Sequence, residues 1–274
     1  MAIYMEINSL NLIYFSPTGT TKKIVENIAL GMKVSRMEHS NFTLPSIISV
    51  ELDEITDGLA IVGAPVYGGR IPLEAVDRFK RLRANDMPTI LVVVYGNREY
   101  EDALLELTNI TREQGLKPIA GGAFVGEHSL SNKDMPIAEG RPDEADINQA
   151  QQFGKEIRDL LIGIDSVNNL SPLNIPGNFP YKERRAPLKI APFIDEMLCT
   201  KCESCISVCP TGVITINEVL QINSDNCIRC CACIRSCPSE ALYFSDPIIK
   251  RTAETLYKNC SKRKEPEMYI SAEM

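Results

Sequence analysis

A duplicated run of cysteines constrains the fold of this chain more than any other feature of its sequence. None of the ten cysteines lies before Cys199, and nine fall between Cys199 and Cys237. A disulfide framework more often spreads its partners through a small secreted protein, whereas crowded thiols in a reducing compartment indicate metal binding. The pattern recurs after 28 residues (227 − 199), so that Cys199, Cys202, Cys205, Cys209 and Pro210 correspond to Cys227, Cys230, Cys233, Cys237 and Pro238.

The spacing within each run suits an iron–sulfur cluster. A cubane cluster needs a thiolate at each iron corner, and Cys-x-x-Cys-x-x-Cys supplies three from one loop, so the last has to come from elsewhere. The runs resemble those of bacterial two-cluster ferredoxins, in which the fourth cysteine of each run binds the other cluster. Two structural zinc sites or ordinary disulfides are the alternatives, although zinc sites usually pair two Cys-x-x-Cys knuckles. The resemblance implies one [4Fe–4S] cluster on Cys199, Cys202, Cys205 and Cys237, and a second on Cys227, Cys230, Cys233 and Cys209.

Two cysteines fall outside the repeated spacing. Cys231 lies within the second run, where we expect a small packing residue rather than a ligand. Cys260 stands alone near the C-terminus, where we expect a free surface thiol. Beyond each proline, residues 213–216 align with residues 241–244, so each half predicts a ligand loop, a short helix and a strand.

The residues around the runs are acidic. Seven Asp and Glu residues and three Lys and Arg residues lie between Ala191 and Asp246, which leaves a formal charge of −4 (3 − 7) before any cluster is counted. A negative environment opposes the addition of an electron. The sequence therefore predicts low reduction potentials for both clusters.

Apolar runs alternate with amphipathic segments between residues 10 and 164. This alternation predicts a parallel sheet with helices on both faces. Ligands bind to such sheets beyond the carboxyl ends of the strands, so the loops after Phe15, Val62 and Tyr95 are the candidates. We expect strands at 12–15, 34–44, 59–62, 90–95 and 119–125, and helices at 20–32, 71–83, 101–114 and 146–161.

The loop after the first strand, Ser16–Thr21, is rich in hydroxyls and leads into a helix. Backbone N–H groups, hydroxyls and the helix N-terminus together cradle a phosphate, and a loop without Lys or Arg suits a terminal monoester. The phosphate-loop spacing of nucleotide hydrolases and the Gly-x-Gly-x-x-Gly fingerprint are both absent. The alternative is a hydroxyl-rich helix cap that binds nothing.

The loops after the next two strands suit a flat ligand. Glycines flank Tyr67, whose ring is free to stack on a heterocycle, and Gly96 allows the backbone to approach one. With these loops the chain resembles the flavodoxin family, and as a whole it resembles a fusion of a flavodoxin-like domain with a two-cluster ferredoxin domain. It departs from many flavodoxins in having no Trp, and in having Thr20 where Asn is usual. The resemblance implies FMN, with Ser16, Thr18, Gly19, Thr20 and Thr21 at its phosphate and Pro65, Val66, Tyr67, Gly68, Gly69, Tyr95, Gly96, Asn97, Arg98 and Tyr100 beside its isoalloxazine.

Three further residues are candidates near the flavin. His128 follows the fifth strand and either relays a proton or is a polar loop residue. Arg70 and Arg98 either offset negative charge on a reduced flavin or are surface charges.

The predicted fold is an α/β flavodoxin-like doubly wound parallel sheet followed by a small α+β two-cluster ferredoxin domain. We expect the first domain at 1–165, a linker at 166–187, the second domain at 188–246 and a polar tail at 247–274. The linker is rich in Pro, Asn and Gly and ends in a basic cluster, Lys182, Arg184 and Arg185. A second basic cluster, Lys262–Lys264, is expected to be solvated.

Composition and charge argue against two further classes of function, nucleic-acid binding and membrane insertion. A net charge of −7 disfavours nucleic acid as a partner, and no apolar run approaches the ~18 residues of a membrane span. The first residues do not resemble a signal peptide, which favours the cytoplasm, and oxygen-sensitive clusters favour an anaerobic one. We expect an electron carrier between the clusters, FMN and redox protein partners. An FMN-dependent reductase of a small organic acceptor and a redox sensor are the alternatives, so the sequence leaves open whether the chain is an enzyme, and also its oligomeric state.

Overall fold

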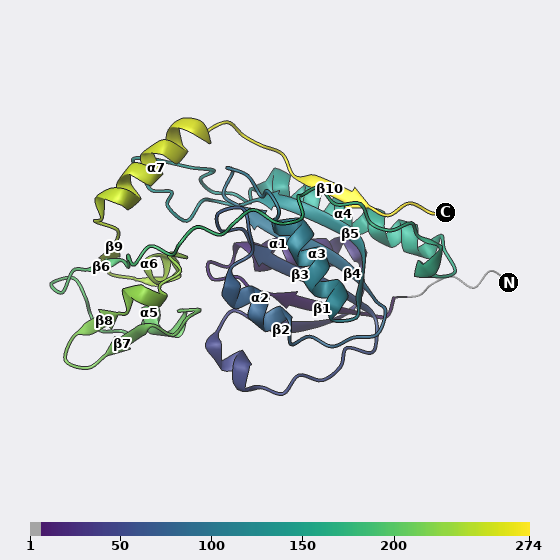
Figure 1. Cartoon of the computed structure of the whole chain (residues 1–274), viewed down its shortest axis with the longest axis horizontal. Helices are drawn as coiled ribbons and strands as arrows, with labels where there is room; N and C mark the ends of the chain where they lie inside the picture. Colours follow the sequence, from purple (N-terminus) through teal and green to yellow (C-terminus); the bar gives the residue numbers. More distant parts are fainter. Residues whose placement is uncertain (1–6) are drawn as a thin grey trace.

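A computed structural model describes residues 7–274 of the chain (Figure 1). A six-stranded sheet forms its larger part, in the order β10-β5-β4-β3-β1-β2. The first five strands pair in parallel, and β10 pairs antiparallel with β5 at the edge. The strands are β1 (Ser9–Tyr14), β2 (Arg36–Asn41), β3 (Leu59–Pro65), β4 (Met87–Tyr95), β5 (Leu116–Val125) and β10 (Glu267–Ile270).

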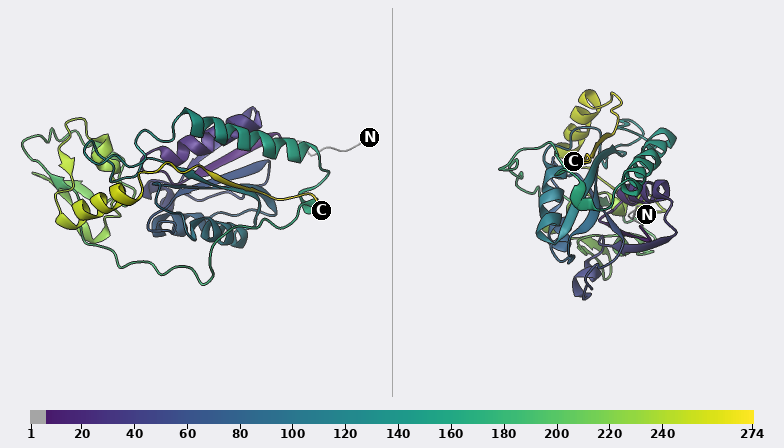
Figure 2. Two further views of the ribbon diagram at one scale, coloured as in Figure 1. Left: turned by 90° about the horizontal axis from the view of Figure 1, so that it is seen from above. Right: turned by 90° about the vertical axis from the view of Figure 1, so that its right-hand side faces the viewer.

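Helices cover both faces of the sheet, and the alternation of side chains along β1 shows why (Figure 2). Leu12 and Tyr14 belong to a core with α1 (Thr20–Met32) and α4 (Glu144–Ile162), whereas Ile13 packs on the opposite face. That second core contains residues of α2 (Leu73–Phe79) and α3 (Ala103–Glu113). Every residue of β4 is buried, as expected for the centre of a parallel sheet.

Most of the expected elements are present in this domain, and α1 has the expected bounds. The second helix is shorter than the expected 71–83. It begins at Leu73, which directly follows Pro72 and is 54% exposed. The α-helix ends at Phe79, after which 3₁₀-type hydrogen bonds to Arg78 and Phe79 turn the chain.

The cysteine segment folds into two pseudo-equivalent halves beside the sheet (Figure 1). The strand that begins each half pairs antiparallel with the strand that ends the other, so the halves interlock around one small core. The elements are β6 (Phe193–Ile194), α5 (Ser204–Ser207), β7 (Ile214–Ile216), β8 (Leu220–Ile222), α6 (Ala232–Ser236) and β9 (Leu242–Tyr243).

The C-terminal residues differ from the expected solvated tail. Helix α7 (Pro247–Asn259) leaves the cysteine segment, and the chain then returns along the sheet to form β10 (Figure 2). The second basic cluster is held by the larger domain: Arg263 lies 2.6 Å from a carboxylate oxygen of Asp143, and Lys264 pairs with Glu99. The C-terminal segment therefore adds an antiparallel edge strand to the sheet of the larger domain.

The linker also packs against the larger domain. The Lys182 amide donates to Asp102 at 2.6 Å, its ammonium pairs with Glu101, and Arg184 lies 2.7 Å from Glu106. These contacts fix the path of the chain between its two parts. No helix among residues 7–274 has the length and apolarity that crossing a membrane requires.

Candidate functional site

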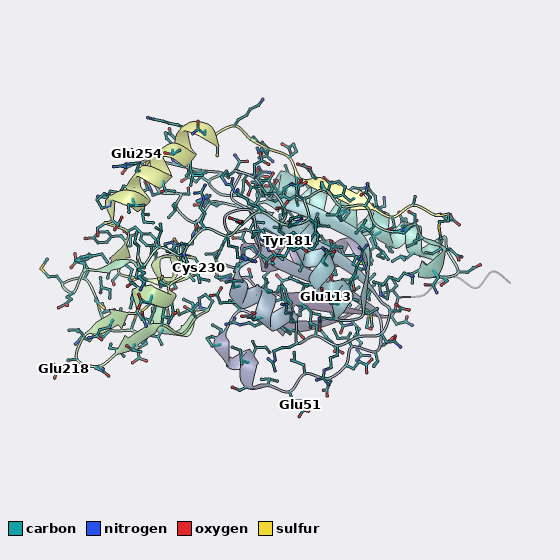
Figure 3. The ribbon with its side chains drawn as sticks, viewed as in Figure 1. Glu51, Glu113, Tyr181, Glu218, Cys230 and Glu254 are labelled. Atoms are coloured by element: carbon teal, nitrogen blue, oxygen red, sulfur yellow. The ribbon has the colours of Figure 1, made fainter. Side chains whose placement is uncertain are left out.

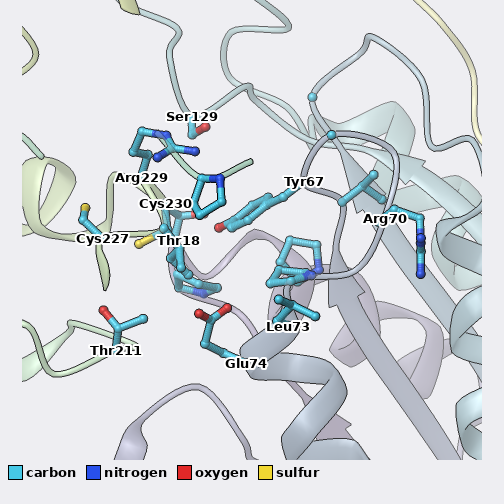
Figure 4. Close-up of a pocket in the computed structure, with 18 of the residues that line it drawn as sticks. Thr18, Tyr67, Arg70, Leu73, Glu74, Ser129, Thr211, Cys227, Arg229 and Cys230 are labelled. Atoms are coloured by element: carbon cyan, nitrogen blue, oxygen red, sulfur yellow. The ribbon is translucent and has the colours of Figure 1, made fainter. Parts of the chain in front are cut away.

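A cavity of about 1330 Å³ lies between the larger domain and the cysteine segment. The loops that follow β1, β3, β4 and β5 form one wall, and Cys227–Cys230 belong to the other (Figure 4). The structure thus places the carboxyl ends of four strands opposite one cysteine run. This is the edge at which open α/β sheets bind ligands.

The hydroxyl loop is shaped by internal hydrogen bonds. The Lys22 amide donates to Ser16 Oγ at 3.0 Å, and the Ser16 amide donates to Thr43 Oγ1 at 2.8 Å. Gly19 has a φ of 79°, which favours glycine, and α1 begins at the next residue. Four of the five residues expected at a phosphate line the cavity, Gly19 being the exception: Ser16, Thr18, Thr20 and Thr21.

Tyr67 projects into the cavity from the loop after β3 (Figure 4). Burial raises the pKa of its phenol well above the ordinary value, and negative charge on Cys230 and Cys231 raises that pKa further. Its ring therefore lies between the larger domain and the second cysteine run. Pro65, Val66 and Gly68 line the cavity with it, whereas Gly69 packs against Glu101.

Some residues of the loop after β4 line the cavity, and others contact different parts of the protein. Tyr95 and Gly96 line the cavity. Asn97 instead donates to the carbonyl oxygens of Cys260 and Lys262, at 2.5 and 2.9 Å. The Tyr100 hydroxyl donates to Glu267 at 2.7 Å, and Arg98 pairs with Glu101 at 2.9 Å. The side chains of Asn97, Arg98 and Tyr100 thus bind other parts of the protein, and these three residues do not line the cavity.

Arg70 is also committed to protein contacts. Its side chain forms a bidentate ion pair with Glu106, with N–O distances of 2.8 and 2.6 Å, and its guanidinium stacks on Tyr181. The hydrogen bond to Glu106 raises the pKa of Arg70. Although Arg70 borders the cavity, its charge is already balanced.

His128 lines the cavity next to Gly96. The Leu130 amide donates to its Nδ1 at 3.0 Å, which leaves Nε2 to carry the proton of the neutral ring. Burial, and then the charges of Arg98 and Arg235, lower its pKa to about 4. His128 is therefore a neutral hydrogen-bond donor near pH 7.

The two cysteine runs share one backbone conformation. Lys201 and Arg229 have φ values of 55° and 54°, and Glu203 and Cys231 have values of 62° and 63°. Each pair is separated by the 28 residues of the sequence repeat. Cys231 is 3% exposed and occupies one of these turn positions, in agreement with a packing role.

The fourth cysteine of each run lies beside the other run. Burial raises the pKa of Cys205, and charges on Cys237 and Cys199 raise it further. In the second run, burial raises the pKa of Cys230 to about 12, and negative charges on Cys209 and Cys227 also act to raise it. Cys237 of the second run thus influences Cys205 of the first, and Cys209 of the first run influences Cys230 of the second.

The donor chemistry of these groups fits [4Fe–4S] clusters. The Ala241 amide donates to Cys237 Sγ at 3.3 Å, and such bonds to sulfur stabilise cluster thiolates. All ten cysteines are free thiols. Among residues 7–274, no three or more His, Cys, Asp or Glu side chains are arranged around a single metal ion.

Several residues at the boundary between the two domains have no recognisable signal in the sequence. Arg78 of α2 donates to the Pro210 carbonyl oxygen at 2.6 Å, across 132 positions of sequence. Arg235 of α6 lies 3.2 Å from Glu127. Isolated arginines have no periodic or spacing signal, so only the tertiary structure reveals these contacts.

Residues 191–238 match the family described as a 4Fe-4S dicluster domain. The chain is similar in structure to a flavodoxin from the domain Archaea, with 15% identity and a TM-score of 0.37 over 56% of this chain and 98% of that one. It is similar also to Fusobacterium nucleatum flavodoxin bound to flavin mononucleotide, with 16% identity and a TM-score of 0.38 over 56% and 98%. Rubredoxin oxygen:oxidoreductase from Desulfovibrio gigas is 14% identical, with a TM-score of 0.38 over 57% and 37%. No curated protein sequence matches the chain.

The order of strands in the sheet identifies the fold of the larger domain without reference to these similar structures. Its parallel strands follow the order 2-1-3-4-5, which is the flavodoxin-like arrangement. The chain therefore combines a flavodoxin-like α/β domain with a 4Fe–4S dicluster domain.

Proposed function

We propose that this chain transfers electrons between two [4Fe–4S] clusters, FMN and external redox partners. The observation that supports this function best is the cavity shared by the hydroxyl loop and by Cys227 and Cys230. When bound, the clusters supply one-electron chemistry and FMN supplies one- or two-electron chemistry. Such a chain connects two-electron carriers with one-electron partners.

The eight repeated cysteines would bind the clusters in crossed sets. Cys199, Cys202, Cys205 and Cys237 hold the cluster that we call the outer cluster. Cys227, Cys230, Cys233 and Cys209 hold the inner cluster, beside the cavity. Crossed ligation ties both halves of the segment to both clusters and keeps the clusters close together.

The larger domain would bind and orient FMN. Ser16, Thr18, Thr20 and Thr21 donate hydrogen bonds to the phosphate, and the N-terminus of α1 adds partial positive charge. Tyr67 offers its ring to the isoalloxazine on the side of the inner cluster.

Burial distinguishes the two clusters. Cys202 is exposed, whereas Cys230 is 8% exposed at the boundary between the domains (Figure 3). Glu218 lies at the far end of the dicluster domain in the same view, and Glu203 adjoins Cys202. An external partner with a basic surface would therefore dock at the outer cluster.

A reductase of a small organic acceptor is a second candidate. The cavity extends past the flavin loops to Leu73, Leu188 and Ile248, which offer apolar surface. His128 presents a neutral donor on the same cavity. Steady turnover of a quinone, well above that of free FMN, would favour this function over that of a carrier.

Anaerobic reconstitution tests the proposal. Protein loaded with iron, sulfide and FMN should contain the iron and acid-labile sulfide of two [4Fe–4S] clusters and one flavin. Stepwise reduction followed by absorbance and EPR should then reduce both kinds of cofactor. Zinc or disulfides at these cysteines, with no acid-labile sulfide, would contradict it.

A further inference from the structure

Arg78 is a buried cation at the junction of the two domains. It lies on α2 and is 3% exposed. Its Nη1 donates to the carbonyl oxygens of Phe42 and Thr43, at 2.8 and 2.5 Å, and its Nη2 donates to that of Pro210 at 2.6 Å. One guanidinium thus connects α2, the segment after β2 and the residue that follows Cys209.

Arg78 differs from Arg70 and Arg141, two arginines of low exposure, in its partners. Arg70 pairs with Glu106 and Arg141 pairs with Asp146, but no ion pair among residues 7–274 includes Arg78. Its Nε is buried without a hydrogen-bond partner. The Phe15 ring lies 5.3 Å from Arg78 Cζ, and the charges of Glu74 and Asp77 act on Arg78 without forming an ion pair with it. A buried charge without a direct ion pair is costly, so a nearby anion would offset much of that cost.

The proposed inner cluster would be such an anion. A cubane held by four thiolates is negatively charged and gains one more negative charge on reduction. Pro210, which accepts from Arg78, follows the proposed ligand Cys209 directly. A cation at this position, shielded from water, stabilises the reduced cluster more than the oxidised one.

Among residues 7–274 the other buried arginine is Arg141, which pairs with Asp146 in the larger domain, so no buried arginine other than Arg78 lies beside the first run. The position of Glu203 in the first run corresponds to that of the buried Cys231 in the second, so a carboxylate replaces a neutral thiol there. The nearby Lys201 is exposed and donates to the Glu218 carbonyl oxygen. Arg78 therefore acts on the two clusters unequally.

We propose that Arg78 raises the reduction potential of the inner cluster and so favours movement of electrons from the outer cluster toward the flavin side. In this step one electron leaves the outer cluster, which is oxidised, and reduces the inner one, and no bond is made or broken. The proposal rests on the ligand sets given under the proposed function.

Redox titration of variants tests the proposal. Arg78→Gln removes the charge, and Arg78→Lys keeps it. Arg81→Gln is the matched control, because Arg81 also donates to two carbonyl oxygens, those of Ile47 and Val50, but both lie in the flavodoxin-like domain. The midpoints of both clusters are followed by EPR in anaerobically reconstituted protein, and Cys227→Ser identifies the inner cluster by the signal that it alters.

The expected result is a lower midpoint for the inner cluster in Arg78→Gln. The outer cluster and Arg81→Gln should keep the midpoints of the unmodified protein, and Arg78→Lys should recover most of the shift. Separation of the domains would expose the inner cluster to water and raise its midpoint, so the sign of the shift excludes that explanation. Small-angle scattering of the Arg78→Gln protein measures directly whether the two domains have separated.

Two outcomes would overturn the proposal: an inner midpoint that stays or rises in Arg78→Gln, or an equal fall of both midpoints. Either result would leave the proposed function intact if the clusters still reduce FMN. Failure of the unmodified chain to bind two clusters would instead overturn the proposed function and, with it, the role of Arg78.

Discussion

Arg235 Nη2 lies 3.2 Å from Glu127 Oε1, and this contact joins α6 of the dicluster domain to the loop after β5. The same nitrogen donates to the His128 carbonyl oxygen at 3.2 Å. The two side chains remain 34% and 23% exposed. This junction holds the second cysteine run against the cavity.

Loss of this ion pair should have a small and salt-dependent effect. Glu127→Gln should lower the free energy of unfolding by at most about 1 kcal/mol, because partly exposed pairs contribute little. The loss should shrink at high salt, where screening weakens the native pair as well. The coupling energy between the two side chains is measured by urea unfolding of the apo-protein at low and high salt. Arg235→Gln and the double variant complete the double-mutant cycle. A coupling energy unchanged by salt would contradict the prediction.

Crossed ligation predicts an unusual pattern of iron loss in double variants. Cys209→Ala with Cys227→Ala removes two ligands of the inner cluster alone, so about half of the iron should remain. Cys209→Ala with Cys199→Ala removes one ligand from each cluster, so this double variant should lose most of its iron. Iron and sulfide analysis distinguishes the two cases, and uncrossed ligation predicts the reverse pattern. Cys231→Ala serves as the control that keeps all of the iron.

Gly96 is expected to accept no side chain. A Cβ at this position would lie 2.4 Å from His128 Cδ2 and 2.9 Å from His128 Cα. Gly96→Ala should therefore cost about 1–3 kcal/mol through overpacking, or roughly a 10- to 100-fold loss of FMN affinity if the loop shifts into the cavity. Titration with FMN followed by flavin fluorescence measures the affinity.

Gly163→Ala is the matched control for this change. A Cβ at Gly163 would approach no atom closer than 3.4 Å, and its φ of −81° suits alanine. It should leave FMN affinity unchanged. Equal affinities for the two alanine variants would show that Gly96 does not shape the flavin site.

His128 should make stability depend on pH. Its pKa is about 4 in the folded chain, mainly through burial, against ~6.5 when unfolded. Between these values the unfolded state binds a proton that the folded state does not. Stability is therefore complete above about pH 6.5 and falls toward pH 4, by at most about 1.4 kcal/mol per pH unit and less because the ring is only partly buried.

Urea unfolding of apo-protein across this range tests the effect. His128→Gln should flatten the dependence relative to the unmodified chain. His39→Gln is the control, because that side chain is 41% exposed and lies outside the cavity. Carboxylates titrate in all three proteins, so the difference between curves is the quantity to compare. Identical slopes for His128→Gln and the unmodified chain would contradict the prediction.

Periodic and repeated features were predictable from sequence. Buried runs in β3, β4 and β5 and the apolar stripe of α1 each have a spacing set by backbone geometry. The cysteine spacing is equally direct, because it follows from the shape of the ligand loop. These features do not depend on which distant residue packs nearby.

Contacts made by single residues were not predictable. Only four residues of the C-terminal segment form β10, and their pairing with β5 depends on the path of α7. Asn97 follows the strand that borders the cavity, yet its side chain binds the C-terminal segment. Such choices are decided by tertiary hydrogen bonds, which have no local pattern.

The rate of flavin bleaching after a light pulse tests the central claim most directly. The pulse excites an added photoreductant, which is oxidised and delivers about one electron per molecule to anaerobic protein loaded with clusters and FMN, with cluster and flavin absorbance followed together. Because donor and acceptor would share one cavity, the account predicts a first-order rate that does not change with protein concentration. A rate proportional to protein concentration, or clusters that stay reduced beside oxidised flavin, would contradict it.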